Sequence, residues 1–113
     1  MKIATGYLNL QKDYLKALAQ RKNKVDLLTS SPRANSFYKA GRVKKYIPGI
    51  YRVNEMDCLR RYPQLNIHEW EAYGWTFHGK GAWFYGDDPQ KVELSVVGSS
   101  NYSHRSNRRD TEC

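Results

Sequence analysis

A histidine and a lysine two positions apart, His78 and Lys80, precede a turn of small polar residues, Gly98-Ser99-Ser100-Asn101. Histidine can attack phosphorus directly and form a phosphohistidine, because its neutral form is well populated near pH 7. A lysine ammonium supplies compact positive charge, and serine and asparagine supply short hydrogen-bond donors, for the charged oxygens of a phosphoryl group. Glycine lets the backbone come close to such a group. We interpret these residues as one half of a site for phosphodiester chemistry.

Strands are expected to position this half-site. Residues 75–78 and 82–85 have the composition of two strands. Apolar and polar residues alternate from residue 92 to 97 and end on an apolar pair, which predicts a strand running into a buried centre. Side chains two apart on a strand share a face, so His78 and Lys80 would point the same way.

A histidine in this role needs a carboxylate that fixes its tautomer and orientation. Glu112 is available downstream of the turn, as is Asp110. The alternative for each part taken alone is structural, because single histidines in strands and Gly-Ser turns are common. Their order and spacing together make the interpretation specific.

The first part of the chain has a β-α-β pattern. Residues 2–7 are expected to form a short strand, Asn9 to cap a helix that continues to about Arg21, and residues 25–28 to form a second strand. A basic loop follows over residues 33–45. This order is the unit of a parallel sheet covered by helices.

Two further helices are expected before the half-site. The first extends over residues 47–61, where Pro48 is admissible only in the first turn. Trp70 and Tyr73 are expected to close a second, short helix before Gly74. The fold class predicted from these elements is α/β.

Composition favours one small folded domain over residues 1–113, of which 40% are hydrophobic. No apolar run approaches the roughly 20 residues that cross a bilayer, and the first residues resemble neither a signal peptide nor a transit peptide. The targeting signal of an imported protein would therefore lie outside this sequence. The two cysteines, Cys58 and Cys113, are expected to be ordinary thiols, because no zinc-ligand spacing or disulfide framework is present.

Positive charge is concentrated in the first part of the chain. The formal net charge is +8, made of +10 over residues 1–61 and −2 over residues 62–113. Such a distribution suits a phosphate-bearing partner, either a lipid headgroup, a nucleotide or a nucleic acid, and its alternative is a solvated basic surface. The densest cluster contains Lys39, Arg42, Lys44 and Lys45, for which peripheral binding to an anionic membrane is expected.

The pair His78-Gly79-Lys80 with Gly98-Ser99-Ser100-Asn101 resembles the H-x-K…G-S-x-N signature of the phospholipase D superfamily. One departure is Tyr85, which stands five residues after the lysine where that signature usually has an aspartate. Within the superfamily the sequence resembles the eukaryotic phosphatidylglycerophosphate synthases, in which a tyrosine at this position is expected. The resemblance is carried by Ile3-Ala4-Thr5-Gly6-Tyr7, Ser31-Pro32, Gly74-Trp75-Thr76-Phe77-His78-Gly79-Lys80-Gly81-Ala82-Trp83, Arg105-Ser106 and Arg109-Asp110-x-Glu112.

This resemblance implies a phospholipase D-like half-domain with a mixed β-sheet flanked by helices. It matches the C-terminal half of these enzymes, and we expect the chain to be a fragment truncated at both ends. Family members use two motifs, so the second histidine would come from the missing N-terminal half or from the mate in a homodimer. Neither His68 nor His104 can replace it, because neither is followed by the required lysine.

The resemblance further implies a phosphatidyltransferase acting on CDP-diacylglycerol and glycerol-3-phosphate, with no metal and no cofactor. One histidine attacks the phosphorus and the other acts as general acid and then base, and the sequence leaves open which role belongs to His78. Lys80 and Asn101 would bind phosphoryl oxygens, Ser99 and Gly98 would form the substrate-binding turn, and Glu112 would orient a histidine. A mitochondrial location, peripheral to the inner membrane, is implied, and the chain alone is expected to be inactive.

Three alternatives stay open. A nuclease acting as a homodimer would bind DNA through the basic first part of the chain. The sequence from Gly74 to Trp83, together with Tyr85, argues against nucleic acid as the partner. A cardiolipin synthase-like enzyme would use a different acceptor with the same fold. A non-catalytic fragment would serve only as a basic module on an anionic membrane.

Overall fold

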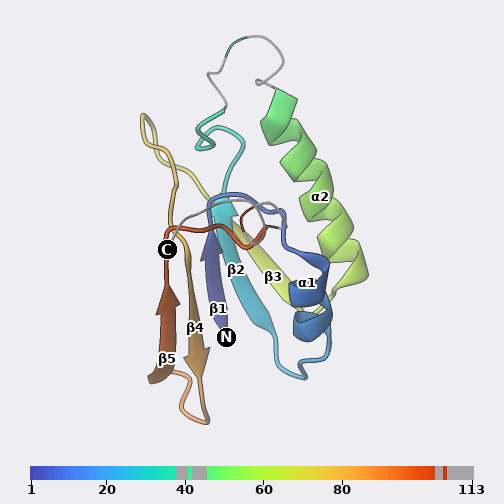
Figure 1. Cartoon of the computed structure of the whole chain (residues 1–113), viewed down its shortest axis with the longest axis vertical. Coiled ribbons are helices and arrows are strands. Elements are labelled where there is room, and N and C mark those ends of the chain that lie inside the picture. The colour runs from blue at the N-terminus through green and yellow to red at the C-terminus, as the bar shows by residue number, and fades with distance from the viewer. Residues whose placement is uncertain (38–40, 42–45, 104–105, 107–113) are drawn as a thin grey trace.

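A five-stranded sheet with two helices forms the domain (Figure 1). The computed structural model describes residues 1–37, 41, 46–103 and 106. The predicted glutamate Glu112 and the predicted basic cluster over residues 39–45 therefore lie outside the described residues. The elements follow one another as β1 (Lys2–Thr5), α1 (Lys12–Ala19), β2 (Val25–Ser30), α2 (Ile47–Arg61), β3 (Leu65–Trp70), β4 (Gly81–Tyr85) and β5 (Val92–Val97).

The sheet is mixed, as predicted, and its strand order is β3-β2-β1-β4-β5. The three strands β1, β2 and β3 are parallel, whereas β4 is antiparallel to both β1 and β5. The predicted β-α-β unit is present at the start of the chain. The first helix begins later than expected, since Gln11 rather than Asn9 is its N-cap and makes no side-chain capping bond.

One face of the sheet carries the core. Ile3, Leu27 and Ala82 point to this face, where they meet Leu18 from α1. The second helix covers this face as well, because Arg52 of α2 pairs with Glu69 of β3, whose side chain points to the same face. Among the described residues no helix covers the opposite face, which exposes a broad hollow of about 730 Å³ lined by side chains such as His68 and Trp83.

The strand β5 differs from its prediction, because it is exposed along its whole length instead of entering a buried centre. It is the edge strand beside β4, and no described element packs on its outer side. Its alternation of apolar and polar residues therefore reflects the two faces of an edge strand. Val92, Leu94 and Val96 stay exposed on it.

Residues 65–70 form the strand β3, so the predicted short helix ending at Trp70 and Tyr73 is wrong. The strand pairs with β2 along its full length, from Val25↔Leu65 to Ser30↔Trp70, and these ladder bonds override the local helical spacing. Residues 75–80 are also not a strand, since they have no ladder partner. By contrast, α2 has the predicted bounds, with a proline in its first turn. No described helix is long and apolar enough to cross a membrane.

Replacing a core leucine should unfold the domain more readily than replacing an exposed one. Leu27 is fully buried, so Leu27→Ala is expected to lower the free energy of unfolding by about 2–5 kcal/mol. The matched variant Leu94→Ala lies on the exposed edge and should change it by about 0.5 kcal/mol or less. Urea denaturation followed by circular dichroism measures both values. Equal losses in the two variants would contradict the assignment of the core to one face.

Candidate active site

His78 and Lys80 lie in an extended segment that enters the sheet at Gly81. The Lys80 ammonium donates a 3.1 Å hydrogen bond to the His78 carbonyl oxygen, and it lies 3.1 Å from Nδ1 and 3.2 Å from Nε2 of the imidazole. Nearly equal distances to both ring nitrogens place the ammonium against the ring as a whole. The pair is therefore together, as the spacing predicts, although the segment is not a strand.

The two side chains differ in exposure. Lys80 is only 9% exposed, whereas His78 is exposed to solvent. A buried ammonium needs hydrogen-bond acceptors to offset lost hydration, and the His78 carbonyl supplies one of them. The arrangement presents an imidazole at the surface with a fixed positive charge behind it. This is the charge distribution that a phosphoryl group would meet on approach to His78.

Asn101 reaches the same place from the turn that follows β5. A methyl group added at Gly6, directly after β1, would lie 3.5 Å from Asn101 Oδ1 and 3.8 Å from His78 Cα. Gly6 therefore lies beside both predicted site residues. The buried Oδ1 of Asn101 has no hydrogen-bond partner among the described residues. A buried polar atom without a hydrogen bond lowers stability by about 1–3 kcal/mol. Such atoms occur where a group is held for a ligand and also where the structure is strained.

The turn after β5 is open. A methyl group added at Gly98 would meet nothing within 4 Å, so no neighbour in the described chain explains this glycine. Ser99 is exposed beside it. Both positions remain predictions for substrate contact. The orienting role of Glu112 also stays a prediction, since that residue lies outside the described residues.

His68 takes a different place from His78. It lies on β3, on the sheet face without helix cover, where its Nε2 is 3.5 Å from Asp26 Oδ1. The pKa of Asp26 is lowered, first by a hydrogen bond from Asn66 and then by His68. Within the described ranges, His68 therefore belongs to a surface contact with Asp26 rather than to the half-site.

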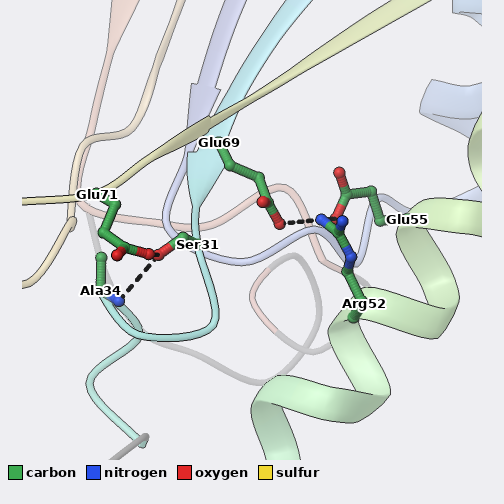
Figure 2. Close-up of polar contacts among 6 residues, drawn as sticks. All are labelled: Ser31, Ala34, Arg52, Glu55, Glu69 and Glu71. Atoms are coloured by element: carbon green, nitrogen blue, oxygen red, sulfur yellow. Dashed lines mark hydrogen bonds and ion pairs between the residues drawn. The ribbon is translucent and has the colours of Figure 1, made fainter.

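A polar network that sequence reasoning missed lies at the ends of β2 and β3. Figure 2 shows Arg52 of α2 between two carboxylates, Glu55 on the same helix at 3.1 Å and Glu69 on β3. Glu55 is only 7% exposed. Burial, followed by repulsion from Glu69, raises the pKa of Glu55 despite the attraction of Arg52. The ion pair ties α2 to the third strand.

A separate set of hydrogen bonds holds the segment that leads to His78. Ser31 Oγ donates a 2.6 Å hydrogen bond to Glu71 and accepts one of 3.2 Å from the Ala34 amide (Figure 2). The Phe77 amide then donates a 3.0 Å bond to the Ala34 carbonyl. A continuous chain of hydrogen bonds therefore joins the end of β3 to the residue before His78. The available sequence signal was the Ser31-Pro32 stop after β2, but the carboxylates that use it are distant in sequence.

No protein-family model matches the chain. The chain is 34% identical to the mitochondrial CDP-diacylglycerol--glycerol-3-phosphate 3-phosphatidyltransferase of Gallus gallus, over 97% of this chain and 21% of that protein. It is 31% identical to a probable enzyme of the same name from Dictyostelium discoideum, over 97% of this chain and 20% of that protein. For the Saccharomyces cerevisiae protein of that name the identity is 33%, over 95% of this chain and 24% of that protein.

A solved structure shares the fold. Phosphatidylserine synthase from Haemophilus influenzae superposes with a TM-score of 0.63 over 73% of this chain and 21% of that chain, at 22% identity. The two proteins share a mixed α/β fold, and this chain carries one H-x-K and one G-S-x-N element. Its assignment as a phospholipase D-like half-domain stays a prediction. The predicted resemblance to the CDP-diacylglycerol–glycerol-3-phosphate 3-phosphatidyltransferases is confirmed over nearly the whole chain. The chain spans about a fifth of the length of these relatives.

Neutralising Glu55 should stabilise the protein at neutral pH. A carboxyl whose folded pKa is raised contributes most stability below its ordinary pKa, and that stability declines as pH rises toward the folded value. Glu55→Gln mimics the neutral form, so its free energy of unfolding should exceed that of the wild type at pH 7 and approach it as pH falls below the ordinary pKa. Urea denaturation between pH 4 and 8 measures the difference.

Asp57 on the same helix provides a control of opposite sign. Desolvation by itself would raise the pKa of Asp57, but hydrogen bonds from Arg61 and Arg60 lower it. Asp57→Asn should therefore destabilise the protein at pH 7, and the loss should shrink as pH falls through the folded pKa. A Glu55→Gln variant less stable than wild type at pH 7 would mean that attraction by Arg52 outweighs burial.

Ser31→Ala should loosen the His78 segment. The substitution leaves the buried Ala34 amide without its acceptor, at an expected cost of about 1–3 kcal/mol in unfolding free energy. It should also shift the backbone amide signals of Phe77 and His78 in NMR spectra, while Ser31→Thr restores both. Ser95→Ala on the exposed β5 is the control and should cost about 0.5 kcal/mol or less. Unchanged Phe77 and His78 signals in Ser31→Ala would rule out the connection.

Proposed function

We propose that this chain supplies one of two half-sites of a phosphatidyltransferase that makes phosphatidylglycerophosphate from CDP-diacylglycerol and glycerol-3-phosphate. The observation that carries the proposal is the Lys80 ammonium held 3.1–3.2 Å from both ring nitrogens of His78. The side-chain amide of Asn101 also lies beside Gly6, close to His78. Support for the substrates comes from relatives that are named for this reaction and match 97% of the chain.

The proposed reaction proceeds in two displacements. One histidine attacks the phosphorus of CDP-diacylglycerol, a nitrogen–phosphorus bond forms, and the bond to the CMP oxygen breaks. The other histidine gives a proton to CMP as it leaves. That histidine then takes the proton from the glycerol-3-phosphate hydroxyl, whose oxygen attacks the phosphohistidine and releases the first imidazole. His78 takes one of these two roles.

The other residues act on charge and orientation. Lys80 and the Asn101 amide would bind the non-bridging oxygens, on which negative charge is carried through the transfer. Gly98 and Ser99 would form the turn that approaches the phosphoryl group, and Glu112 would hold a histidine in one tautomer. The steps as proposed use no metal.

The second half-site would come from another part of the protein or from a second copy of this chain. The related proteins of Gallus gallus and Homo sapiens are named as mitochondrial. We place the function at the mitochondrial inner membrane, where the protein would be peripheral and contact anionic lipid. The 113-residue chain alone is then inactive, because one histidine cannot serve both roles in one transfer.

Phosphate binding tests the half-site without requiring turnover. Inorganic phosphate or CMP added to the ¹⁵N-labelled chain should shift the signals of His78 and Asn101. Lys80→Met removes the fixed charge and should weaken this binding about tenfold, since a charge-assisted hydrogen bond contributes about 1.5–3 kcal/mol. Lys22→Met, at an exposed position after α1, is the matched control and should change it less than about twofold. Equal binding by both variants would contradict the assignment of Lys80.

Product analysis separates the proposed reaction from its alternatives. The purified chain supplied with CDP-diacylglycerol and glycerol-3-phosphate should give no turnover. In an assembly that supplies the second motif, glycerol-3-phosphate should be the acceptor and His78→Ala should abolish product. Product formed only with phosphatidylglycerol as acceptor would identify a cardiolipin synthase-like reaction instead.

A further inference from the structure

The loop between β3 and the half-site carries two large aromatic side chains in water. We call residues 71–76 the aromatic loop. Tyr73 is fully exposed at 103% of its reference area, and Trp75 is 73% exposed. Trp70 and Phe77, which flank the loop, are instead half-buried and lie with ring centroids 5.6 Å apart. Of these four aromatic side chains, only the two at the tip of the aromatic loop are therefore exposed.

The backbone of the aromatic loop is tightly turned. Gly74 has a φ of 78°, a left-handed conformation that glycine adopts without steric cost, and the Trp75 amide donates a 3.2 Å hydrogen bond to Ala72. The base is fixed by Glu71, which accepts from Ser31 at 2.6 Å and pairs with Arg33 at 3.6 Å. The fold therefore holds Tyr73 and Trp75 away from the body of the domain.

Two further features at this end of the molecule point to the same kind of partner. Arg33 at the base of the loop has an exposed side chain. The first turns of α2 expose Tyr46, Ile50 and Val53, and Figure 1 shows the start of α2 and the aromatic loop at the same end of the domain. Exposed aromatic and aliphatic side chains beside the Arg33 cation, on a chain with a formal net charge of +8, complement an anionic lipid surface.

We propose that the aromatic loop is an interfacial anchor, in which Tyr73 and Trp75 enter the headgroup region of an anionic bilayer. Indole and phenol rings suit this region because each combines an apolar ring with a hydrogen-bonding group. The proposal rests on the proposed function only in taking a lipid as substrate. It adds the surface through which the domain reaches that lipid.

The distance between anchor and half-site fits the thickness of the interface. Trp75 precedes His78 by three residues, which span at most about 10 Å when fully extended. The polar layer on each side of a bilayer is about 5–8 Å thick. A Trp75 ring in that layer therefore keeps His78 close to the depth of the lipid phosphates. The hydrogen bond from Phe77 to Ala34 fixes the direction of the connecting segment.

Vesicle binding by the 113-residue chain tests the anchor directly. We expect co-sedimentation with vesicles of phosphatidylcholine and phosphatidylglycerol in a 7:3 ratio, and weaker binding to phosphatidylcholine alone. Trp75→Ala and Tyr73→Ala should each lower the partition coefficient several-fold, and together by about tenfold or more. Trp75→Tyr should restore most of the binding. Both positions are exposed, and urea midpoints would check that the variants remain folded.

Val97→Ala is the matched control, because Val97 is also 73% exposed but lies at the end of β5. It should bind as the wild type does. Wild-type binding by the Trp75→Ala, Tyr73→Ala double variant, or no binding by the unmodified chain, would overturn the proposal. Loss of self-association of the chain in these variants, without loss of vesicle binding, would also overturn it and assign the loop to a protein interface.

The phosphate titration and the vesicle assay, carried out on the same chain, separate the anchor from the proposed function. A failed phosphate titration with intact vesicle binding would count against the half-site alone. Failed vesicle binding with an intact phosphate titration would count against the anchor alone.

Discussion

The end of β1 lies directly against the half-site. Thr5 is fully buried, and the Gly6 carbonyl that follows accepts a 2.8 Å hydrogen bond from Ser30. A methyl group at residue 6 would already contact Asn101 Oδ1 and His78 Cα at 3.5 and 3.8 Å. A longer side chain would need the space between them. Gly6, which follows the central strand, therefore brings the end of β1 to within ordinary van der Waals distance of both His78 and Asn101.

The change of strand direction beside β1 explains why distant segments gather there. Parallel β2 and β3 bring Ser31 and Glu71 to the edge at which β1 ends. Antiparallel β4 begins at the end of the sheet where β1 finishes, so Lys80 lies there. The strand β5 ends at the same place, because Val97 pairs with Gly81. A sheet of parallel strands only would place the start of β4 at the opposite edge. The mixed topology is thus a condition for the motif to assemble.

Local pattern predicted the parts of this structure that depend on local interactions. The bounds of α2, the β-α-β start, the strands β4 and β5, and the closeness of His78 and Lys80 all follow from spacing and composition. The misassigned elements depend on partners distant in sequence. The segment β3 forms a strand because it pairs with β2. Residues 75–78 do not form a strand, since no neighbouring strand pairs with them. The burial of β5 failed for the same reason, since alternation cannot show which faces are covered.

The ion pairs and hydrogen bonds beside the half-site follow from this lack of a ladder. Apolar packing is non-directional and would hold residues 75–80 near the sheet without fixing their angle. A functional constellation needs its groups held to within about 0.5 Å, which directional contacts supply.

The bonds from Glu71 to Ser31, from Ala34 to Ser31 and from Phe77 to Ala34 replace the missing strand pairing with three defined contacts. The buried Glu55 beside Arg52 has a comparable effect on α2, at an electrostatic cost visible in its raised pKa. The hydrogen bonds through Ser31 and Ala34 therefore fix the direction of the segment that carries His78, whereas the cost of burying Glu55 falls on the contact between α2 and β3.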